Sequence, residues 1–439
     1  MTACTTPDSL TFRELGVPTR LARVLERTGI TSPFPIQEQT LPDGIAGRDL
    51  LARARTGSGK TLAYGLSALS RLQGRPVTPL RPQGLVLVPT RELAMQVIDD
   101  LAPLAEGCDL RVRLIAGGMP YASQVRALER GVHLVVATPG RLVDLVERGS
   151  IHLDHVSITV LDEADQMADM GFMPVVRQIL DLTKAGGQRL LFSATLDGDV
   201  DALVRDYLRN PARHVLDAPG ATVPTMAHHV LVVHPADRQA VTEQIGARTG
   251  RTIFFVRTQA GADRLAERLA ARGVAAGALH GGKSQAVRTR TLKAFREGVT
   301  PALVATDVAA RGIHVDGISL VVHVDAPADS KDYLHRAGRT ARAGESGTVV
   351  TLVSPKQERE VARLTSRAGV QPKVQRIRPM DANLVAITGA QEPSGVAWAP
   401  SRPSGEGAPS RPKRPARGTV DRRSRPARGP RRGRSDRRA

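Results

Sequence analysis

The stretch Ala54-Arg55-Thr56-Gly57-Ser58-Gly59-Lys60-Thr61 decides how the rest of the sequence is interpreted. It follows the phosphate-binding pattern G-x-x-x-x-G-K-[ST], with Ala54 in place of the first glycine. The glycines let backbone N–H groups turn toward phosphate oxygens, and the helix expected after the loop points its positive end at them. Lys60 can reach the β- and γ-phosphates, and the Thr61 hydroxyl can bind Mg²⁺. Apolar residues 50–52 and a helical pattern at 62–66 flank the loop, which predicts a nucleotide site between a strand and a helix.

Length, charge and cysteine content narrow the class of protein. A chain of 439 residues predicts two or three domains. The net charge of +19 and pI of about 11.0 indicate a polyanionic partner, nucleic acid first and an acidic membrane surface second. Residues 401–439 hold thirteen Arg, one Lys and three acidic residues, a net +11. Two cysteines are too few for a disulfide framework and fit a reducing compartment. Without a signal peptide pattern or an apolar run of about 18 residues, we expect a cytoplasmic protein with no membrane partner.

Short apolar runs, each followed by polar loop residues, alternate with helical stretches along most of the chain. The runs are 85–88, 134–137, 158–161 and 190–192, then 230–233, 253–256, 302–305, 320–324 and 348–352. This alternation is typical of parallel strands, with ligand groups at the carboxyl ends of the strands. We therefore predict an α/β protein with two parallel-sheet lobes, 1–216 and 227–372. A Pro/Gly-rich linker, 217–226, joins them, and residues 373–439 form a disordered tail rich in Arg, Pro and Gly.

The acidic segment Asp162-Glu163-Ala164-Asp165 follows the apolar run 158–161. An Asp at the end of a buried strand beside a phosphate loop can hold Mg²⁺. The neighbouring Glu can activate an attacking water. The competing interpretation is an acidic helix start that suits the helix dipole. The phosphate loop in the same lobe favours the catalytic interpretation.

Arg336, Arg339 and Arg342 are spaced three residues apart. On a helix this spacing puts them on one face, and no matching acidic row lies nearby. Such a cationic face is expected to meet an anion, and the γ-phosphate of a nucleotide in the first lobe is the candidate. The alternative is a solvated basic face.

Polar loops recur after the apolar runs. They are Pro89-Thr90-Arg91-Glu92, Gly117-Gly118, Thr138-Pro139-Gly140-Arg141, Gln285 with Arg288, and Thr306-Asp307. Thr, Arg and Gly N–H groups commonly contact phosphate and sugar oxygens, which fixes position without reading sequence. Each loop alone is more often a turn or a helix cap. Together they favour a nucleic-acid backbone as the ligand.

In this order, the motifs resemble those of the DEAD-box RNA helicase family, of the bacterial type with a short basic tail, over about residues 10–354. The resemblance implies two tandem RecA-like lobes, ATP and Mg²⁺ as cofactors, and RNA as partner. The segment Gly29-Ile30-Thr31-Ser32-Pro33-Phe34-Pro35-Ile36-Gln37 is similar to the adenine-reading Q motif. By that resemblance Gln37 pairs with the adenine edge, and Phe12 packs on the base.

The family pattern assigns roles to the other matching residues. Lys60, Asp162, Glu163, Arg339 and Arg342 would be catalytic, with the two arginines as fingers, and Thr61 and Asp162 would bind the metal. Thr56, Gly57, Ser58 and Gly59 would complete the nucleotide site. Ser193, Thr195, Asp165 and Arg336 would couple the lobes, with Arg336 at the lobe interface. The residues on RNA-backbone positions are Pro89, Thr90, Arg91, Gly118, Thr138, Arg141, Gln285, Arg288 and Thr306.

One segment departs from the family pattern. The motif A-R-G-x-D reads Ala310-Arg311-Gly312-Ile313-His314, so the Asp that contacts the ATP ribose is replaced by His314. A neutral imidazole can still donate or accept one hydrogen bond. Whether His314 or Asp316 makes the ribose contact stays open.

The motifs lead to one expected function with two alternatives. We expect an RNA-dependent ATPase that locally unwinds short RNA duplexes or remodels RNA–protein complexes, with weak sequence preference. The alternatives are a DNA-directed helicase or translocase and a non-catalytic RNA clamp or annealing chaperone. The Arg/Gly/Pro-rich tail is expected to tether RNA, and we expect a monomer.

Overall fold

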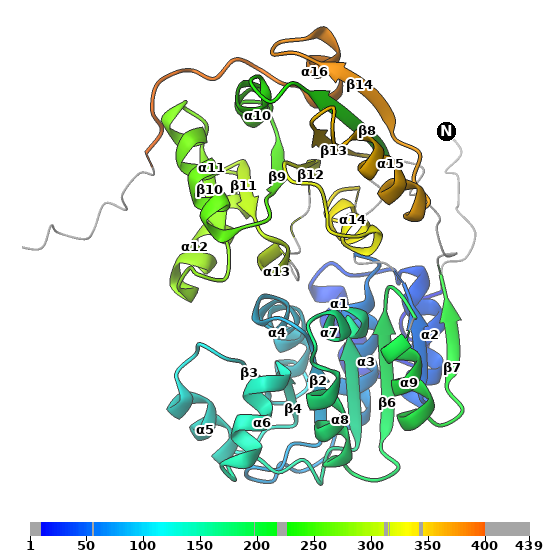
Figure 1. Ribbon diagram of the computed structural model, residues 1–439. Coiled ribbons are helices and arrows are strands. Elements are labelled where there is room, and N and C mark those ends of the chain that lie inside the picture. Colours follow the sequence, from blue (N-terminus) through cyan, green and yellow to red (C-terminus); the bar gives the residue numbers. More distant parts are fainter. Residues whose placement is uncertain are drawn as a thin grey trace, which may run out of the picture. The chain divides into compact units, whose positions relative to one another are not determined.

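The computed structural model describes residues 10–54, 57–196, 198–216, 226–310, 315, 317–341 and 346–399. The expected linker, apart from Met226, and the tail beyond residue 399 lie outside these residues. The described chain forms two α/β lobes, each built on one sheet with helices on both faces (Figure 1).

The first lobe starts with two helices, α1 and α2, that precede its first strand. Its elements are α1 (Thr19–Arg27), α2 (Pro35–Ala46), β1 (Leu50–Arg53), α3 (Lys60–Leu72), β2 (Gly84–Leu87), α4 (Arg91–Glu106), β3 (Val112–Ile115), α5 (Tyr121–Glu129), β4 (Leu134–Ala137), α6 (Pro139–Glu147), β5 (Ile158–Asp162), α7 (Ala164–Asp169), α8 (Met173–Asp181), β6 (Gln188–Ser193), α9 (Gly198–Tyr207) and β7 (Ala212–Val215). Gly47 in the left-handed region (φ 89°) ends α2, and the Thr90 hydroxyl caps α4 by accepting from the N–H of Leu93.

The second lobe repeats the alternation. Its elements are β8 (Met226–Val233), α10 (Arg238–Gly246), β9 (Arg251–Phe255), α11 (Gln259–Ala271), β10 (Ala276–Leu279), α12 (Gln285–Arg296), β11 (Ala302–Ala305), α13 (Asp307–Ala310), β12 (Ile318–His323), α14 (Ser330–Ala337), β13 (Gly347–Val353), α15 (Glu358–Arg367), β14 (Lys373–Ile377) and α16 (Ala382–Thr388). All nine apolar runs predicted as strands form strands in the two lobes.

The two sheets share one topology. Their strand orders are β3-β4-β2-β5-β6-β1-β7 and β10-β11-β9-β12-β13-β8-β14. Numbered from the first strand of each lobe, both orders read 3-4-2-5-6-1-7, and the paired strands run parallel. The carboxyl ends of all strands of a sheet therefore meet at one edge, where ligand-binding loops collect. The predicted α/β class with two tandem parallel-sheet lobes is confirmed.

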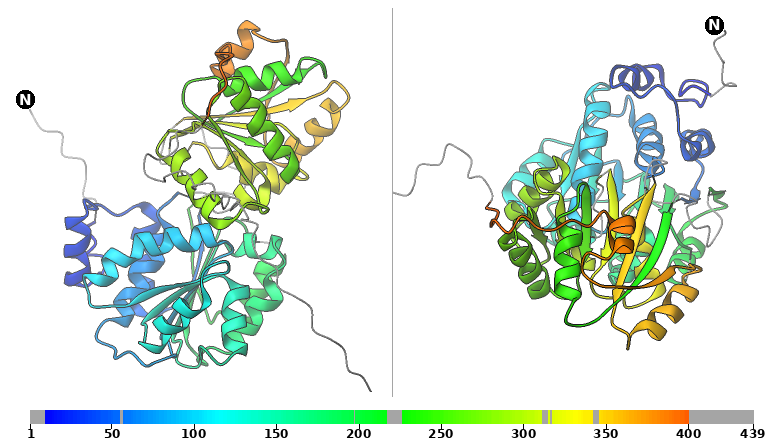
Figure 2. Two further views of the ribbon diagram at one scale, coloured as in Figure 1. Left: turned by 90° about the vertical axis from the view of Figure 1, so that its left-hand side faces the viewer. Right: turned by 90° about the horizontal axis from the view of Figure 1, so that it is seen from above.

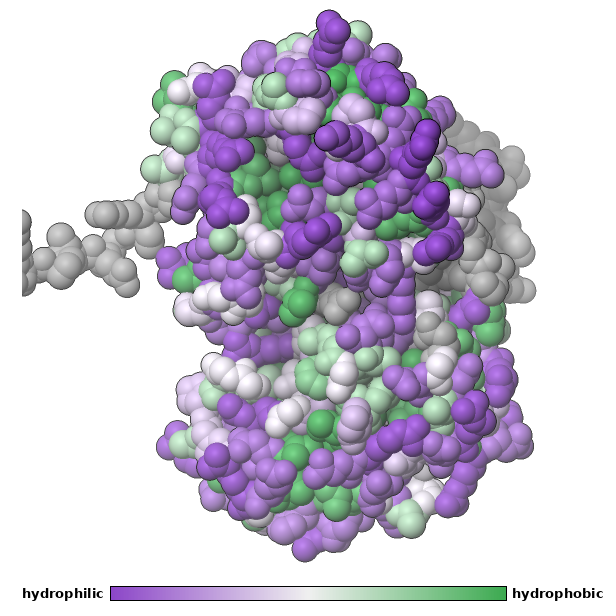
Figure 3. All heavy atoms as spheres, in the orientation of Figure 1, coloured by the Kyte–Doolittle hydropathy of each residue, from purple (hydrophilic) through white to green (hydrophobic). Residues whose placement is uncertain are grey.

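Each sheet is buried on both faces by apolar side chains. Along β2, Leu85 and Leu87 belong to one core, whereas Val86 packs into the core on the other face. The strands are Leu-, Val- and Ala-rich because helices cover both faces, as the two views of Figure 2 show. Hydrophilic side chains cover most of the face drawn in Figure 3, and hydrophobic ones lie there in separate groups. No helix in the described ranges has the length and apolar character to cross a membrane.

The end of the second lobe differs from the prediction. Residues 373–377 form β14, which pairs with β8, and α16 follows, so the expected lobe boundary at residue 372 is wrong. Strand β14 lies at a sheet edge and carries Lys373, Gln375 and Arg376, so it has no apolar run to reveal it. The edge strands β3 and β7 lacked a recognisable run for a related reason, because they carry Arg113, and Arg213 with His214. The edge strand β10 was missed for another reason, since its sequence Ala-Gly-Ala-Leu has only one large apolar residue. Met226, assigned to the linker, is the first residue of β8.

Candidate functional site

A cavity of about 380 Å³ opens beside the predicted phosphate loop. Three groups of residues line it: the loop and first turn of α3, the acidic residues at the end of β5, and residues of α4 and of the segment between α1 and α2. The lining includes Gly57, Gly59, Lys60, Thr61, Asp162, Glu163, Thr28, Ile30, Phe34, Gln96 and Asp100. Strand order explains this grouping, because β1 and β5 both pair with β6 and end at the same edge.

The phosphate loop is connected directly to the Q-motif segment. The Gln37 side-chain amide donates from Nε2 to the Gly59 carbonyl (3.0 Å), and its Oε1 accepts from the N–H of Phe34 (2.8 Å). Gly59 has a φ of 89°, and a Cβ there would lie 2.5 Å from Gln37 Nε2, so glycine is required. Lys60 is buried and donates to the Ala54 carbonyl (2.9 Å). The Ala54 departure therefore keeps the carbonyl that holds the lysine. Thr56 lies outside the described residues.

The two phenylalanines near the adenine side take different positions. Phe12 is 4% exposed and belongs to the core of the first lobe, whereas Phe34 is 54% exposed and lines the cavity. The predicted contact of Phe12 with a base therefore stays a prediction. Phe34 was not singled out in the sequence analysis, although it lies within the quoted Q-motif segment.

Asp162 is buried at the end of β5 and held by two hydrogen bonds. Its Oδ2 accepts from the Tyr64 hydroxyl (3.0 Å), and its Oδ1 accepts from the N–H of Glu163 (2.9 Å). Burial raises the pKa of Asp162 to about 6, an effect that nearby Lys60 opposes and Glu163 reinforces. Tyr64 carried no sequence signal, because it reads as an ordinary apolar position of α3. The charged form of the Asp162 carboxylate is therefore not fully compensated by the positive charge nearby.

Glu163 makes the turn from β5 into α7. Its φ of 51° lies in the left-handed region, which costs a non-glycine residue roughly 1–2 kcal/mol. Such strain occurs most often at functional positions. The turn directs the Glu163 side chain to the cavity that Lys60 and Asp162 also line.

Asp165 joins the acidic segment to the end of β6. Its Oδ2 accepts from the backbone N–H of Thr195 (3.0 Å) and from the Thr195 hydroxyl (3.1 Å), and its own N–H donates to Ser193 Oγ (3.2 Å). The structure therefore brings together the predicted Asp165, Ser193 and Thr195. A movement of the segment after β6 would therefore displace Glu163 and Asp162, which lie two and three residues before Asp165.

The arginine segment does not form one helical face. Helix α14 ends at Ala337, so Arg336 lies on the helix, whereas Arg339 lies in the turn that follows Gly338. Arg336 is 3% exposed and forms a bidentate pair with Asp307 (Nε to Oδ1 2.5 Å, Nη2 to Oδ2 2.7 Å). Its Nη1 donates to the Asp325 carbonyl (2.7 Å). The expectation of a shared cationic face is therefore wrong, because glycine ends the helix one turn early.

The contacts of Arg336 also bear on its predicted role. Asp307, Asp325 and Phe255, whose ring centroid is 5.1 Å from the guanidinium carbon, all belong to the second lobe. These contacts hold α14 on its own sheet, and the expected role of Arg336 at the lobe interface stays a prediction. Arg342, His314 and Asp316 lie outside the described residues.

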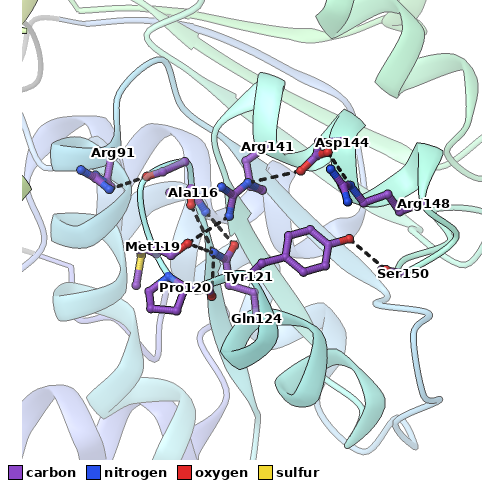
Figure 4. Close-up of polar contacts among 11 residues, drawn as sticks. Arg91, Ala116, Met119, Pro120, Tyr121, Gln124, Arg141, Asp144, Arg148 and Ser150 are labelled. Atoms are coloured by element: carbon purple, nitrogen blue, oxygen red, sulfur yellow. Dashed lines mark hydrogen bonds and ion pairs between the residues drawn. The ribbon is translucent and has the colours of Figure 1, made fainter. Parts of the chain in front are cut away.

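The loops after β2, β3 and β4 meet at one corner of the first lobe. Arg91 donates from Nη1 to the Gly117 carbonyl, and Arg141 donates to the Met119 carbonyl (3.3 Å) (Figure 4). Gly118 has a φ of 72°, and a Cβ on it would overlap the Arg91 guanidinium. The structure therefore brings Arg91, Gly118 and Arg141 together. They lie on the half of the sheet away from β1.

In the second lobe, the residues predicted to contact RNA follow β10 and β11. Gln285 and Arg288 lie in the first turns of α12, and Thr306 is buried after β11. Glu92 of α4 accepts from Gln285 Nε2 (3.1 Å) and pairs with Arg288 Nη2 (3.0 Å). Glu92 thus joins residues of both predicted RNA-contact groups.

Comparisons with known proteins agree with this geometry. The DEAD/DEAH box helicase family model matches residues 34–203, and that of the helicase conserved C-terminal domain matches 237–344. The DEAD-box ATP-dependent RNA helicase CshA of Geobacillus kaustophilus is 38% identical, over 84% of this chain and 78% of the relative. CshA of Bacillus licheniformis is 36% identical, over 82% and 74%. The pre-mRNA-processing ATP-dependent RNA helicase PRP5 of Mycosarcoma maydis is 38% identical, but the chain covers only 32% of its length.

A solved structure shows the same fold. S. cerevisiae Dbp5 bound to RNA and ADP BeF3 superposes with a TM-score of 0.75 at 29% identity, over 85% of this chain and 97% of that one. The chain belongs to the DEAD-box helicase family. It is an ATP-dependent RNA helicase, and as an enzyme it hydrolyses ATP. The expected fold, family and activity are confirmed.

Proposed function

We propose that ATP binds the cavity beside α3 and that arginines of the second lobe complete the catalytic site. The observation that carries this proposal is the convergence of Lys60, Asp162 and Glu163 on one cavity. Gln37 reads the adenine edge, and Lys60 contacts the β- and γ-phosphates. Arg339 and Arg342 act as fingers that stabilise charge on the transferring phosphoryl group. Support for their approach comes from Lys331 in the first turn of α14, which donates to Asp169 at the end of α7 (2.9 Å).

The residues around Asp162 fit a magnesium ion. The Asp162 carboxylate and the Thr61 hydroxyl supply oxygen ligands, and Mg²⁺ usually combines one or two such ligands with substrate phosphates and waters. No group of three or more His, Cys, Asp or Glu side chains within the described ranges could hold a metal by itself, which agrees with a site that the nucleotide completes. The raised pKa of Asp162 points the same way, because a cation would favour its charged form. When bound, Mg²⁺ would neutralise charge on the β- and γ-phosphates.

Glu163 then accepts the proton of the attacking water. Its place directly after Asp162, at the cavity wall, puts the carboxylate next to the phosphate side of the site. Asp165 is hydrogen-bonded to Thr195, so a movement of the acidic segment during hydrolysis would also move the residues after β6.

The Glu163→Gln variant tests this assignment. We expect it to bind ATP and RNA with near-normal affinity and to lose RNA-stimulated ATPase by about 10²–10⁴-fold, the usual contribution of a general base. Glu129→Gln on α5 is the matched control, because Glu129 is exposed and outside the cavity. Near-normal ATPase in Glu163→Gln, measured by phosphate release, would refute the role. Comparing stimulation by RNA and by DNA of the same sequence tests the DNA-directed alternative, and a lack of any stimulation supports the clamp.

Local strand separation follows from closure in this proposal. RNA contacts from Arg91, Gly118 and Arg141 in the first lobe and from Gln285, Arg288 and Thr306 in the second bend the bound strand, and a bent strand cannot stay paired. Hydrolysis then reopens the protein and releases the RNA. The predicted contacts go to phosphate and sugar, so sequence preference is weak. The reaction unwinds short duplexes or remodels RNA–protein complexes.

The basic tail extends the RNA contact as a tether. Its net charge of +11 over residues 401–439 supports this proposal, because phosphate neutralisation makes binding depend on salt. A chain truncated after residue 399 should bind RNA more weakly and with a smaller salt dependence, with an unchanged ATPase rate at saturating RNA. An unchanged salt dependence would reject the tether. We further propose that the protein acts as a cytoplasmic monomer, which sedimentation and cell fractionation can test.

A further inference from the structure

Helix α6 carries a row of charged residues beyond the predicted RNA contact Arg141. Arg141, Asp144 and Arg148 follow the spacing i, i+3, i+7, so they share one face of the helix and its C-cap. Asp144 Oδ1 accepts from Arg148 Nε (2.7 Å), and Asp144 Oδ2 lies 3.6 Å from Arg141 Nε. Figure 4 shows these three side chains together with Tyr121 of α5.

Tyr121 completes the cluster from the neighbouring helix. The guanidinium carbons of Arg148 and Arg141 lie 5.0 Å and 5.9 Å from the Tyr121 ring centroid, within cation–π range. The Tyr121 hydroxyl and Ser150 Oγ form a hydrogen bond (3.1 Å), which fixes the ring. Two independent contacts therefore hold the Arg148 guanidinium, one to its Nε and one to its face.

The stability of the fold does not explain why the Arg148 guanidinium is held by two contacts. The Arg148 side chain is 62% exposed, and exposed ion pairs four residues apart on a helix contribute little to folding. The contact to Asp144 uses only Nε, so the two Nη groups remain available as donors to a ligand. A guanidinium held at Nε and over a ring suits a phosphate, which it can bind through two parallel hydrogen bonds.

The cluster continues the corner built by the loops after β2, β3 and β4. Arg141 joins it to that corner by donating to the Met119 carbonyl (3.3 Å), and Gln124 of the Tyr121 helix accepts from the N–H of Ala116 (3.2 Å). Arg148 lies seven residues after Arg141, about 10 Å farther along the helix axis. An RNA strand that contacts Arg91 and Arg141 and continues along α6 therefore comes next to the guanidinium of Arg148.

We propose that Arg148 is an additional contact for a backbone phosphate of the bound RNA strand, and that Tyr121 and Asp144 position its guanidinium. The ligand class is a phosphodiester of single-stranded RNA that extends past the Arg91–Gly118–Arg141 corner. The proposal rests on the RNA path proposed above and adds a contact outside the motifs that define that path. It predicts a larger RNA footprint on the first lobe than those motifs alone provide.

The same lobe supplies a matched control. Arg177 lies over the Tyr207 ring (5.8 Å) and pairs with Asp206 (2.5 Å), which is the same combination of arginine, tyrosine and carboxylate. These residues belong to α8 and α9, which follow β5 and β6; α8 packs against α6, but neither helix belongs to the loops after β2, β3 and β4. Arg177→Ala therefore removes the same chemistry at a place where the proposed RNA path does not run.

The test compares Arg148→Ala with Arg177→Ala in the full chain. Binding of a fluorescein-labelled single-stranded RNA is measured by anisotropy from 50 to 200 mM salt. We expect Arg148→Ala to weaken binding about 5–10-fold and to reduce the slope of log K against log salt by about 0.7, the value for one phosphate on a single strand. Arg177→Ala should match the unaltered protein in its RNA affinity and in the slope of log K against log salt. The proposal is overturned if Arg148→Ala and Arg177→Ala have the same RNA affinity and the same slope of log K against log salt. It is also overturned if the Arg148 cluster binds an acidic protein while Arg148→Ala leaves RNA binding unchanged.

The ATPase separates this contact from the proposed function and from a structural role. Arg148→Ala should raise the KM for RNA by the same 5–10-fold and leave kcat at saturating RNA unchanged, whereas a folding defect would lower both the thermal midpoint and kcat. Asp144→Asn and Tyr121→Leu should raise the KM for RNA by a smaller factor, about two- to fourfold, since they only position the guanidinium. If Arg91→Ala also binds RNA normally, the proposed RNA path itself fails. If Arg91→Ala alone weakens binding, only the Arg148 contact fails.

Discussion

The buried ion pair between Asp307 and Arg336 is the contact whose removal the structure predicts most sharply. Arg336 on α14 meets both carboxylate oxygens of Asp307 at 2.5 and 2.7 Å and the Asp325 carbonyl at 2.7 Å. The Phe255 ring covers the guanidinium. The Asp307→Ala variant leaves this buried cation with one carbonyl acceptor and the ring.

The expected loss follows from burial. Removing one partner of a buried ion pair costs about 3–5 kcal/mol, because the remaining charge stays desolvated. The Asp307 side chain is 27% exposed, so water can replace part of the lost contact, and we expect about 2–3 kcal/mol. For a lobe of this size that corresponds to a fall of roughly 5–10 °C in its unfolding midpoint.

Hydrogen exchange measures this loss for each lobe separately, which matters because a two-lobed chain does not unfold in one step. Amides of β9, β11 and β12 should lose about 2–3 kcal/mol of protection in Asp307→Ala, whereas those of β2, β4 and β5 should not change. Glu297→Ala is the control, because it removes an exposed pair with Lys293 (3.8 Å) and should cost under about 0.5 kcal/mol. The reasoning is refuted if Asp307→Ala and Glu297→Ala lose equal protection. RNA-stimulated ATPase should fall in Asp307→Ala, because the N–H of Arg339 donates to the Arg336 carbonyl (3.1 Å).

Two further predictions concern the first lobe. In Tyr64→Phe the carboxylate of Asp162 loses a hydrogen bond that favours its charged form, so its pKa in the metal-free protein rises above about 6. Titration of this carboxyl by NMR without Mg²⁺ measures the shift, and an unchanged pKa would contradict it. Gly118→Ala puts a side chain at a φ of 72° against the Arg91 guanidinium, so chemical unfolding should show a loss of about 1 kcal/mol and RNA titration a weaker affinity. Gly74→Ala, with a φ of 73° and open space, should show the stability loss without the RNA defect, and equal RNA affinity in both variants would exclude the clash.

The features that the sequence predicted correctly depend on local patterns. A buried parallel strand must be a short apolar run, and a phosphate loop needs glycines and a lysine at fixed spacing, so both are visible within a few residues. Lys60, Asp162 and Glu163 were expected near one another because parallel strands end at a common edge of the sheet, and all three line one cavity. Ser193, Thr195 and Asp165 likewise lie at or just after the ends of the neighbouring strands β6 and β5, and they do contact one another.

The features that it missed depend on tertiary contacts. The spacing of the arginines predicted one face, but the helix ends at Gly338, and Arg336 turns inward to a carboxylate 29 residues away in the sequence. Tyr64 acts on Asp162 from a position that only needs to be apolar for α3 to pack. Edge strand β14 shows no apolar run, because half of such a strand faces solvent and charged residues there prevent unwanted pairing.

The repeated strand order explains why two similar lobes do different chemistry. In both, the fifth strand leads to residues proposed for hydrolysis: β5 ends at Asp162, and β12 leads to α14 and Arg339. The third and fourth strands lead to proposed RNA contacts in both. The first strands differ, because β1 is followed by a glycine loop, whereas β8 is followed by His234-Pro235-Ala236-Asp237. Without glycines, and with a proline that lacks an N–H, the loop after β8 cannot surround phosphates with backbone donors. Backbone donors after the first strand can therefore bind nucleotide phosphates in the first lobe and not in the second. We propose that the equivalent edge of the second lobe supplies arginines instead.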